Sequence, residues 1–244
     1  ATTVTSANPT TGAAGYYTFD NLIAGTYKIM VMYPTGYTGT GKSTLGSTID
    51  NDSNIDPTTG TSDNIVLTAG QVLTNVDAGI YQLASIGNYI WDDKNGNGIQ
   101  EPTESGINGV TVLLKNAAGT TVQTAVTTTN GATSGYYQFA NLVPATYTVM
   151  VMSPTGYTIS KIDAPGSTDL TDSDFNPSTG NTTPINLASG ENNQTIDGGI
   201  YQAANIGNYV WRDTDGDGIQ DATEVGINGV TVLLKDNTGA TVAT

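Results

Sequence analysis

An internal repeat with a period of 120 residues organises this chain of 244 residues. Three segments recur at that spacing: 15–19 at 135–139, 86–91 at 206–211, and 106–115 at 226–235. Solenoid repeats have periods of about 20–50 residues, so a unit of this length is a small domain with its own core. We therefore expect a tandem array of similar domains.

The chain is two periods long but begins and ends inside a domain. Residues 84–202 (the complete repeat) contain one whole unit, residues 1–83 (the N-terminal part) match its later two thirds, and residues 203–244 (the C-terminal part) match its first third. One interpretation, which we favour, is a window on a longer tandem array that builds a repeating fibre. The alternative is that another copy completes each partial domain by adding strands to an open sheet edge.

The complete repeat is predicted to contain strands and no helices. No segment has an apolar period of 3.6 residues over a helical length. Apolar and polar residues alternate along several segments, which gives each strand one face toward a core. We predict an all-β fold of tandem Ig-like β-sandwich repeats, each of about 120 residues. The expected strands, separated by Gly, Asn, Asp and Pro clusters, are 86–91, 110–115, 120–127, 136–139, 146–152, 183–187 and 195–201.

The residue types that the chain lacks exclude several kinds of chemistry. It has no histidine and no cysteine, so Ser–His and Cys–His nucleophile systems, His/Cys zinc sites and disulfides are excluded. A formal net charge of −15 opposes a nucleic-acid partner, because phosphate binding needs a basic surface. No apolar run approaches the roughly 20 residues of a transmembrane segment, and residues 1–20 do not resemble a signal peptide.

A twelve-residue calcium-loop pattern follows the first expected strand. Residues 93–104 (the first loop) and 213–224 (the second loop) both fit D-x-[DN]-x-[DN]-G-x5-E. Calcium takes six to eight oxygen ligands at about 2.3–2.6 Å, and one segment supplies that many only if it curls around the ion. The pattern occurs twice at the same place in the repeat, which favours a metal site over an ordinary Asp- and Asn-rich turn.

The pattern assigns a ligand role to particular positions of the loops. Positions 1, 3 and 5 supply side-chain oxygens, position 7 a backbone carbonyl, position 9 a ligand acting through water, and position 12 a bidentate carboxylate. In that order the loops offer Asp93, Asn95, Asn97, Ile99, Glu101 and Glu104, and then Asp213, Asp215, Asp217, Ile219, Asp221 and Glu224. The first loop has three carboxylates and the second has five, so we predict tighter calcium binding at the second loop.

A second acidic cluster lies late in each repeat. Oxygen side chains at alternate positions of a turn can line one side of an ion, and an aspartate near the last strand is a further candidate ligand. The same pattern also occurs in turns without a metal, so both interpretations stay open. The candidates are Asp172, Asp174, Asn176 and Asp197 in the complete repeat, and Asp52, Asn54, Asp56 and Asp77 one period earlier.

These motifs together resemble a known family. The order Ile-Gly-Asn-Tyr-x-Trp, calcium loop, Gly-x-Asn-Gly-Val-Thr-Val is similar to the B-type repeat of Sdr-family (serine–aspartate repeat) surface adhesins. The stretch 135–147 resembles the wider Cna B-type, prealbumin-like class. The resemblance implies an extracellular, calcium-rigidified stalk at a microbial cell surface, with any host or matrix ligand bound elsewhere in the full protein. The resemblance assigns the family's calcium loop to both the first and the second loop. It assigns the family's Asp-Ser-Asp turn to residues 172–176 and, less well, to 52–56, where Asn54 replaces an acid.

Many Cna B-type relatives contain a Lys–Asn or Lys–Asp isopeptide bond. The first expected strand, 86–91, has no lysine, and Lys28 corresponds to Thr148 in the complete repeat. Lys115 and Lys235 agree between copies, but they end a strand beside a turn. We therefore expect no such crosslink in this chain.

The motifs favour a structural function over two others. In the structural interpretation, calcium removes the repulsion among Asp-rich loops and adds ligands that close them, and the partners are neighbouring copies of the repeat. An adhesive module for a glycan or host protein is the alternative, and it would need aromatic residues gathered on one exposed face. An enzyme with a carboxylate pair would need a cleft, and these carboxylates are better explained as metal ligands.

Overall fold

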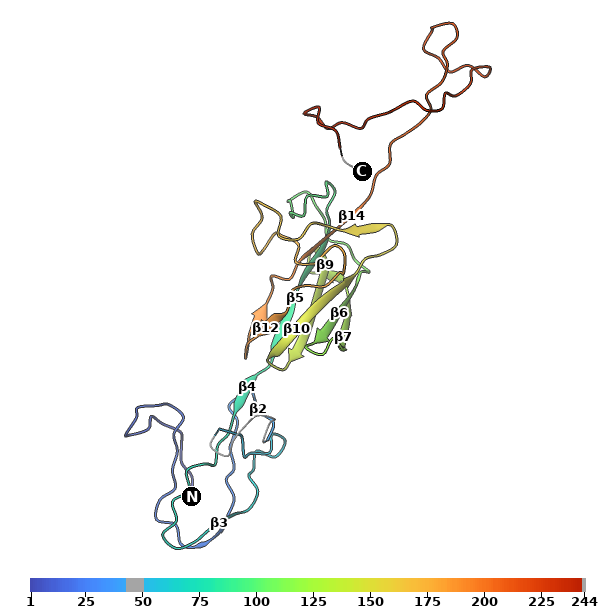
Figure 1. Cartoon of the computed structure of the whole chain (residues 1–244). Helices are drawn as coiled ribbons and strands as arrows, with labels where there is room; N and C mark the ends of the chain where they lie inside the picture. The colour runs from blue at the N-terminus through green and yellow to red at the C-terminus, as the bar shows by residue number, and fades with distance from the viewer. Residues whose placement is uncertain (43–50, 243–244) are drawn as a thin grey trace. The chain divides into compact units, whose positions relative to one another are not determined.

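The structure, a computed structural model, describes residues 1–42 and 51–242. Among these residues the regular elements are all β-strands, and none of the segments described is a helix long and apolar enough to cross a membrane. The chain divides into two compact units, residues 1–202 and residues 203–244. Figure 1 shows that the longest strands belong to the complete repeat.

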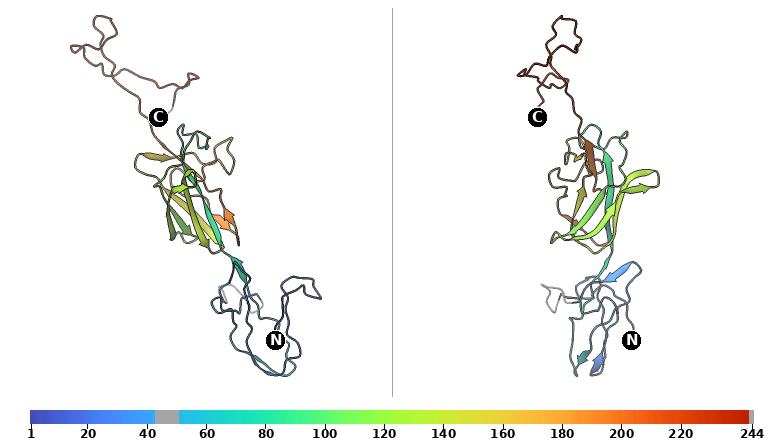
Figure 2. Two further views of the ribbon diagram at one scale, coloured as in Figure 1. Left: turned by 180° about the vertical axis from the view of Figure 1, so that it is seen from behind. Right: turned by 90° about the vertical axis from the view of Figure 1, so that its right-hand side faces the viewer.

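The complete repeat is a sandwich of two sheets, seen from two further sides in Figure 2. The four-stranded sheet has the order β12 (Ile185–Leu187), β10 (Ala145–Met152), β6 (Thr111–Asn116) and β7 (Thr121–Val126). The six-stranded sheet has β11 (Tyr157–Ile159), β14 (Gly198–Gln202), β5 (Ala84–Asp92), β9 (Thr133–Leu142) and β8 (Thr128–Asn130), with β13 (Asn192–Asn193) paired to β5. Strand β5 pairs with three other strands: it runs antiparallel to β9 and parallel to β13 and β14. It is therefore the central strand of this sheet.

The core lies between the two sheets and follows the expected alternation. Along β10, Tyr147, Val149 and Val151 are buried while the intervening residues are half-buried or exposed. Burying an aliphatic or aromatic side chain of this size stabilises a fold by roughly 1.5–3 kcal/mol, so this cluster holds the sheets together. The other core members include Ile86, Ile90, Val110, Val112, Leu114, Tyr137, Phe139, Leu142, Phe175, Ile196 and Ile200.

The all-β sandwich predicted from the sequence is confirmed. Each of the seven expected segments contains a strand, although 136–139 extends to Thr133–Leu142 and 195–201 narrows to Gly198–Gln202. The short strands β8, β11 and β13 were missed. They have only two or three residues each, too few to show an alternation of apolar and polar side chains.

The N-terminal part repeats two strand pairs of the complete repeat in the same register. Strand β1 (Gly25–Tyr27) pairs with β3 (Ile65–Leu67) as β10 pairs with β12. Strand β2 (Tyr37–Gly39) pairs with β4 (Ile80–Gln82) as β11 pairs with β14. These pairs form two separate two-stranded sheets among the described residues.

The described residues of the C-terminal part, 203–242, form no β-strand of two or more residues. The C-terminal part keeps two isolated bridges, Trp211 with Gly226 and Lys235 with Thr241. The same positions are paired in the complete repeat, where Trp91 bridges Gly106 and Lys115 faces Thr121. The local turns of the repeat therefore form in this segment without the extended sheet.

Candidate metal centre

The first loop starts directly after β5 and curls around the carboxylate of Asp93. Asp93 is buried, and its Oδ1 and Oδ2 accept hydrogen bonds from the backbone N–H groups of Asn97 (3.2 Å) and Gly98 (2.8 Å). Asn95 Oδ1 accepts from the N–H of Asn97 at 3.0 Å, and Asn97 Oδ1 accepts from that of Ile99 at 2.7 Å. The side chains at positions 1, 3 and 5 thus all turn back toward the loop's own backbone.

Glu104, at position 12, closes the first loop. Its Oε1 accepts a hydrogen bond from the N–H of Lys94 at 2.8 Å, and its Oε2 accepts one from Glu101 at 3.1 Å. Burial raises the pKa of Glu104. The carboxylate therefore joins the beginning and the end of the loop, which is the task that the pattern gives to position 12.

Polar side chains converge on Glu101 inside the first loop. Glu101 Oε1 accepts hydrogen bonds from the amide groups of Asn97 (2.6 Å) and Asn95 (3.3 Å), and the Asn97 bond above all lowers the pKa of Glu101. Its Oε2 is buried and has no hydrogen-bond partner among the described residues. Side chains at positions 3, 5 and 9 therefore meet around Glu101 Oε1.

The second loop has the same backbone plan with more charge. Asp213 accepts from the N–H groups of Gly216 (2.7 Å) and Gly218 (2.9 Å), and Glu224 accepts from those of Thr214 (2.5 Å) and Asp221 (3.2 Å). Three residues of this loop each offer one carboxylate oxygen, and the three oxygens lie within 4.8 Å of one another. Such a cluster is suited to binding a cation. These residues are Asp213, Asp215 and Glu224.

The first loop also packs against a distant segment, residues 161–173. The N–H of Gln100 donates to the carbonyl of Thr171 at 2.7 Å, and Ile99 bridges Asp172. Gly98 has a φ of +78°, and a Cβ atom there would lie 2.3 Å from the carbonyl oxygen of Lys161. The glycine at position 6 is thus required both by the turn and by this close packing.

A group of aspartates gathers where these two segments meet. Asp172 is 7% exposed, and its Oδ1 has no hydrogen-bond partner among the described residues. Burial raises the pKa of Asp172, and the neighbouring Asp163 and Asp169 raise it further. The sequence analysis missed Asp163 and Asp169, because positions 43 and 49 one period earlier are Ser and Ile.

Asp174 and Asp197 are held together in the complete repeat. The N–H of Asp197 donates to Asp174 Oδ2 at 2.6 Å, while Asp197 itself accepts from the N–H of Tyr89 (3.1 Å) and the amide of Asn88 (2.9 Å). Burial is the main cause that raises the pKa of Asp174 to about 7 and that of Asp197 to about 8. Asp197 therefore ties the last strand to β5.

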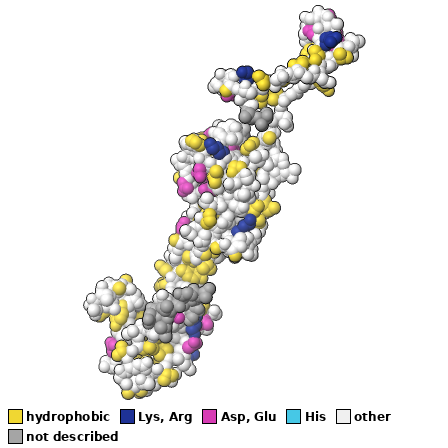
Figure 3. All heavy atoms as spheres, viewed as in Figure 1, with side chains coloured by type: hydrophobic (Ala, Val, Ile, Leu, Met, Phe, Trp, Pro, Cys, Tyr) yellow, Lys and Arg dark blue, Asp and Glu magenta, His cyan; other side chains and the backbone are white. Residues whose placement is uncertain are grey.

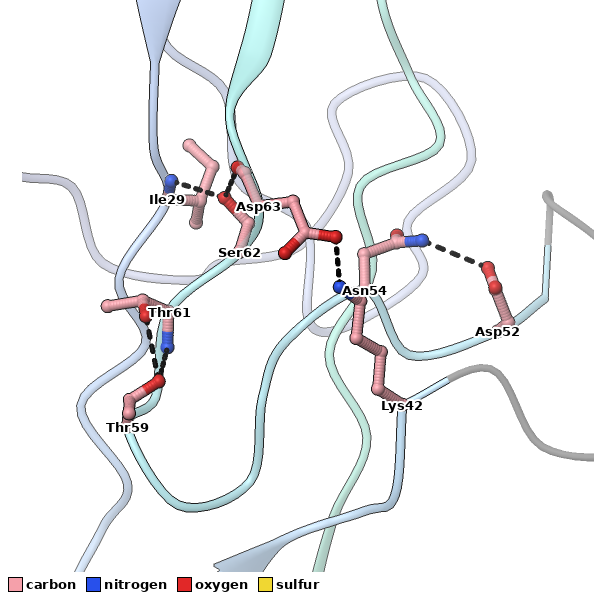
Figure 4. A network of polar contacts seen from close by, with 8 residues as sticks. All are labelled: Ile29, Lys42, Asp52, Asn54, Thr59, Thr61, Ser62 and Asp63. Atoms are coloured by element: carbon pink, nitrogen blue, oxygen red, sulfur yellow. Dashed lines mark hydrogen bonds and ion pairs between the residues drawn. The ribbon is translucent and has the colours of Figure 1, made fainter.

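The matching turn in the N-terminal part, 52–56, also has two aspartates, but an asparagine stands in place of Asp174. Figure 4 shows the amide of Asn54 donating to Asp52 Oδ1, at 3.1 Å, and Lys42 forming an ion pair with Asp63. Asn54 Oδ1 accepts from the N–H of Asp77 at 2.6 Å, as Asp174 does from Asp197. The turn thus keeps the backbone arrangement with an amide in place of a carboxylate.

Asn176 and Asp56 act as turn caps. In both residues Oδ1 accepts hydrogen bonds from the N–H groups two and three residues later, at 2.8–3.2 Å. These backbone bonds lower the pKa of Asp56. Such geometry is typical of an Asx turn, the metal-free interpretation left open for this part of the sequence.

Lys115, one of the two lysines shared between copies, contacts an asparagine. Its Nζ donates to Asn181 Oδ1 at 3.2 Å and lies 3.0 Å from Met150 Sδ. The residue is half-buried on β6. Among the described residues, the hydrogen bonds of Lys115 involve no carboxyl group, and the expectation of no crosslink stays a prediction.

One family matches the chain over nearly its whole length. The family described as SdrD B-like domain matches residues 1–80, 84–200 and 204–244. Serine-aspartate repeat-containing protein D of Staphylococcus aureus (strain Newman) is 42% identical over 233 residues, which cover 93% of this chain and 16% of that protein. Protein F of Staphylococcus epidermidis is 38% identical over 243 residues, 96% of this chain and 13% of that protein. The chain therefore spans about a sixth or less of these relatives.

Two solved structures share a more distant likeness. The minor pilin GBS52 of Streptococcus agalactiae has a TM-score of 0.34 and 11% identity, over 59% of this chain and 61% of that one. The Bacillus anthracis TIE protein has a TM-score of 0.33 and 12% identity, over 73% of this chain and 25% of that one.

Proposed function

Because the chain belongs to the SdrD B-like domain family, we propose that it is a calcium-stabilised segment of an extracellular stalk at a microbial cell surface. The proposal takes residues 84–202 as one whole repeat and residues 1–83 and 203–244 as parts of two others. The function is structural, not enzymatic. Any adhesive ligand is assigned to other parts of the longer protein, since this chain corresponds to only 13–16% of the relatives' length.

The observation that carries the proposal is the junction between the first loop and segment 161–173. Two carboxylate oxygens there, Glu101 Oε2 and Asp172 Oδ1, are buried without a partner. A buried acceptor without a partner costs about 1–3 kcal/mol, and more when it is charged. The groups around the loop are carboxylate, amide and carbonyl oxygens, which are the ligands that calcium prefers. A calcium ion would give these two oxygens the partner that they lack among the described residues.

The proposed ligands fall into two sets. In the first loop they are Asp93, Asn95, Asn97, the carbonyl of Ile99, Glu101 through water, and Glu104, and in the second loop the residues at the same positions. Asp172 is proposed as a further ligand at the junction, with Asp163 and Asp169 beside it. Asp174 and Asp197 remain candidates for a second ion, and so do Asp52, Asn54 and Asp77.

Calcium would make the repeat rigid by joining segments that are far apart in sequence. The first loop follows β5, whereas segment 161–173 lies between β11 and β12. An ion held between them removes the repulsion among their carboxylates and fixes both segments to the end of the sandwich. An ion that binds only the folded chain also stabilises it by mass action, by about 2.7 kcal/mol at a hundredfold excess over Kd.

The adhesive alternative finds less support among the described residues. The exposed tyrosines there are Tyr16, Tyr37 and Tyr209, all in the two partial repeats. Their counterparts in the complete repeat are half-buried. These rings are therefore better explained as packing residues of an incomplete sandwich than as a binding platform.

Calcium titration of the full chain tests the assignment of the loops. We expect at least two sites by calorimetry, and we expect Glu104→Gln and Glu224→Gln each to weaken one site by tenfold or more, because position 12 loses its bidentate carboxylate. Asp20→Asn is the matched control. Asp20 is exposed and corresponds to Ala140 in the complete repeat, so its loss removes one charge without touching either loop.

Equal weakening by all three variants would show that calcium responds only to the net charge of the chain. An unchanged titration in both glutamine variants would exclude the loops as the binding sites. Either result would overturn the proposed function.

A further inference from the structure

The N-terminal part and the complete repeat follow one another with almost no linker. Strand β4 ends at Gln82 and β5 begins at Ala84, so Leu83 alone separates them. Both strands belong to the same compact unit, residues 1–202. Figure 3 shows hydrophobic side chains around this passage, where Leu83 is 42% exposed. A long polar linker lets two domains reorient freely, whereas a single residue leaves the contacts beside it to decide how they move.

The backbone of Gln82 is bonded to the complete repeat through both of its polar groups. Its N–H donates to Ser189 Oγ at 2.8 Å, and its carbonyl accepts a hydrogen bond from the N–H of Gly190 at 3.1 Å. Gln82 is also the partner of Tyr37 in the pairing of β4 with β2. One residue therefore connects a sheet of the N-terminal part to a turn of the complete repeat.

The same contact continues into the first residues of β5. The N–H of Ser85 donates to the carbonyl of Glu191 at 2.9 Å, and β13 runs parallel to β5 from Ser85 onward. Residues 82–86 are thus bonded to residues 189–193 across the boundary between the two repeats. We call these two segments the joint.

The side chain of Gln82 lies between one turn of each repeat. A Cβ on Gly36 would lie 3.6 Å from Gln82 Nε2, and a Cβ on Gly190 would lie 2.8 Å from Gln82 Oε1. Burial raises the pKa of Tyr147 in β10, and the nearby Tyr81 raises it further. Two successive side chains at the end of β4 therefore lie beside the complete repeat.

The turn 188–191 is built by its own hydrogen bonds. The N–H of Ala188 donates to Glu191 Oε2 at 2.8 Å, and the N–H of Glu191 donates to the carbonyl of Ala188 at 3.2 Å. Residues 68–71 form the same turn, although no atom lies within 4 Å of a Cβ on Gly70. The turn therefore forms without a strand beside it, and a surface that is already ordered binds at a lower entropic cost.

We propose that the turn 188–191 is a docking surface for the preceding repeat of the same chain, and that it couples the two repeats into one rigid body. The partner that it fits is the end of a β-strand whose N–H and carbonyl groups both face the turn. The inference rests on the proposed stalk function and adds to it a joint that contains none of the proposed calcium ligands. Calcium would stiffen each repeat, and the joint would keep successive repeats in line.

The distance between two spin labels, measured by pulsed EPR on the full chain in saturating calcium, tests the joint. The chain has no cysteine, so Thr35→Cys and Thr155→Cys place labels at equivalent exposed positions on either side of the joint. We expect the labelled but otherwise unaltered chain to give a single narrow distance distribution.

The turn variant is Ser189→Ala with Gly190→Asn, which removes one acceptor and adds a side chain against Gln82. Gly70→Asn is the matched control, because residue 69 is already alanine and both turns then contain Ala-Asn. Asparagine tolerates the positive φ of both glycines. We expect the turn variant to widen the distribution by about twofold or more, since the two repeats would then reorient, and the control to leave it narrow.

Hydrogen exchange at the amide of Gln82 is a second and milder test. Ser189→Ala removes the acceptor of this N–H, so we expect its exchange to become about tenfold faster or more. The control amide is that of Val149, which donates to a hydroxyl, Thr182 Oγ1, away from the joint and should exchange at an unchanged rate.

A broad distribution in the unaltered chain would overturn the proposal. So would a turn variant as narrow as its control, or an exchange rate at Gln82 that Ser189→Ala leaves unchanged. These outcomes are distinct from failure of the proposed function, because a chain with a loose joint would still bind calcium at both loops, as the titration measures.

Discussion

Gly98 and Gly218 occupy the same position of the first and second loops and differ only in their surroundings. Both have a φ of +78°, which an L-residue adopts at a cost of roughly 1–2 kcal/mol. A Cβ on Gly98 would meet the carbonyl of Lys161, whereas a Cβ on Gly218 would meet no atom within 4 Å. A comparison of substitutions at these two glycines therefore separates the effect of turn strain from the effect of packing against segment 161–173.

We expect Gly98→Ala to destabilise the complete repeat by about 2–4 kcal/mol, since turn strain and a backbone clash add together. Gly218→Ala should leave the unfolding of the complete repeat unchanged, because the second loop belongs to another compact unit. Chemical denaturation of both variants measures the difference. Equal effects would contradict the proposed docking of the first loop.

At the scale of elements, the sequence predicts long strands and local turns better than contacts between loops. Strand β10 shows a clear alternation over eight residues and was predicted almost residue for residue, whereas β13 has two residues and was missed. The sequence could predict the ligand pattern of the two loops, because its oxygens follow one another along one segment. Asp163 and Asp172 lie apart along the chain, so only the folded path of the backbone brings them to the first loop.

The buried pair of Asp174 and Asp197 predicts how the metal-free chain responds to pH. Their pKa values are raised to about 7 and about 8, from the 3.8 of an ordinary aspartate. A carboxyl group with a raised pKa favours the folded state when protonated, so stability should fall as pH rises from about 4 through 8. We expect the chain in chelator to melt several degrees higher at pH 5.5 than at pH 8.5.

Asp197→Asn is the matched variant for this pH dependence, because an amide resembles the protonated acid and does not titrate. It should remove part of the difference in melting temperature between the two pH values. Calcium should flatten or reverse the slope, since bound carboxylates must be ionised and protons compete with the metal. A melting temperature in chelator that rises from pH 5.5 to 8.5 would contradict the assignment.

The charge difference between the two loops gives another prediction at this scale. The first loop contains three carboxylates and the second contains five. Salt screens exposed charges more strongly than buried ones, and the second loop is the more exposed. We expect the calcium affinity of the second loop, measured in the Glu104→Gln variant, to fall more steeply with added NaCl than that of the first loop, measured in Glu224→Gln. Parallel salt dependences would contradict this account.

At the scale of the whole molecule, the chain combines one sandwich with two partial ones and relies on no disulfide. It has no cysteine, and its net charge of −15 is concentrated in loops and turns rich in aspartate. These carboxylates oppose a compact fold unless a cation neutralises them. Calcium would therefore act as the crosslink of each repeat, and a stalk made of such repeats would be rigid in calcium and soft without it.

The most direct test of this account is the melting temperature of the full chain in calcium and in chelator at pH 7.5. A ligand at a hundredfold excess over Kd contributes about 2.7 kcal/mol, and each kcal/mol shifts the melting temperature of a domain the size of the complete repeat by roughly 4 °C. The account predicts a rise of about 10 °C or more in calcium, with little rise in magnesium at the same concentration. Superimposable melting curves in calcium and chelator would contradict it.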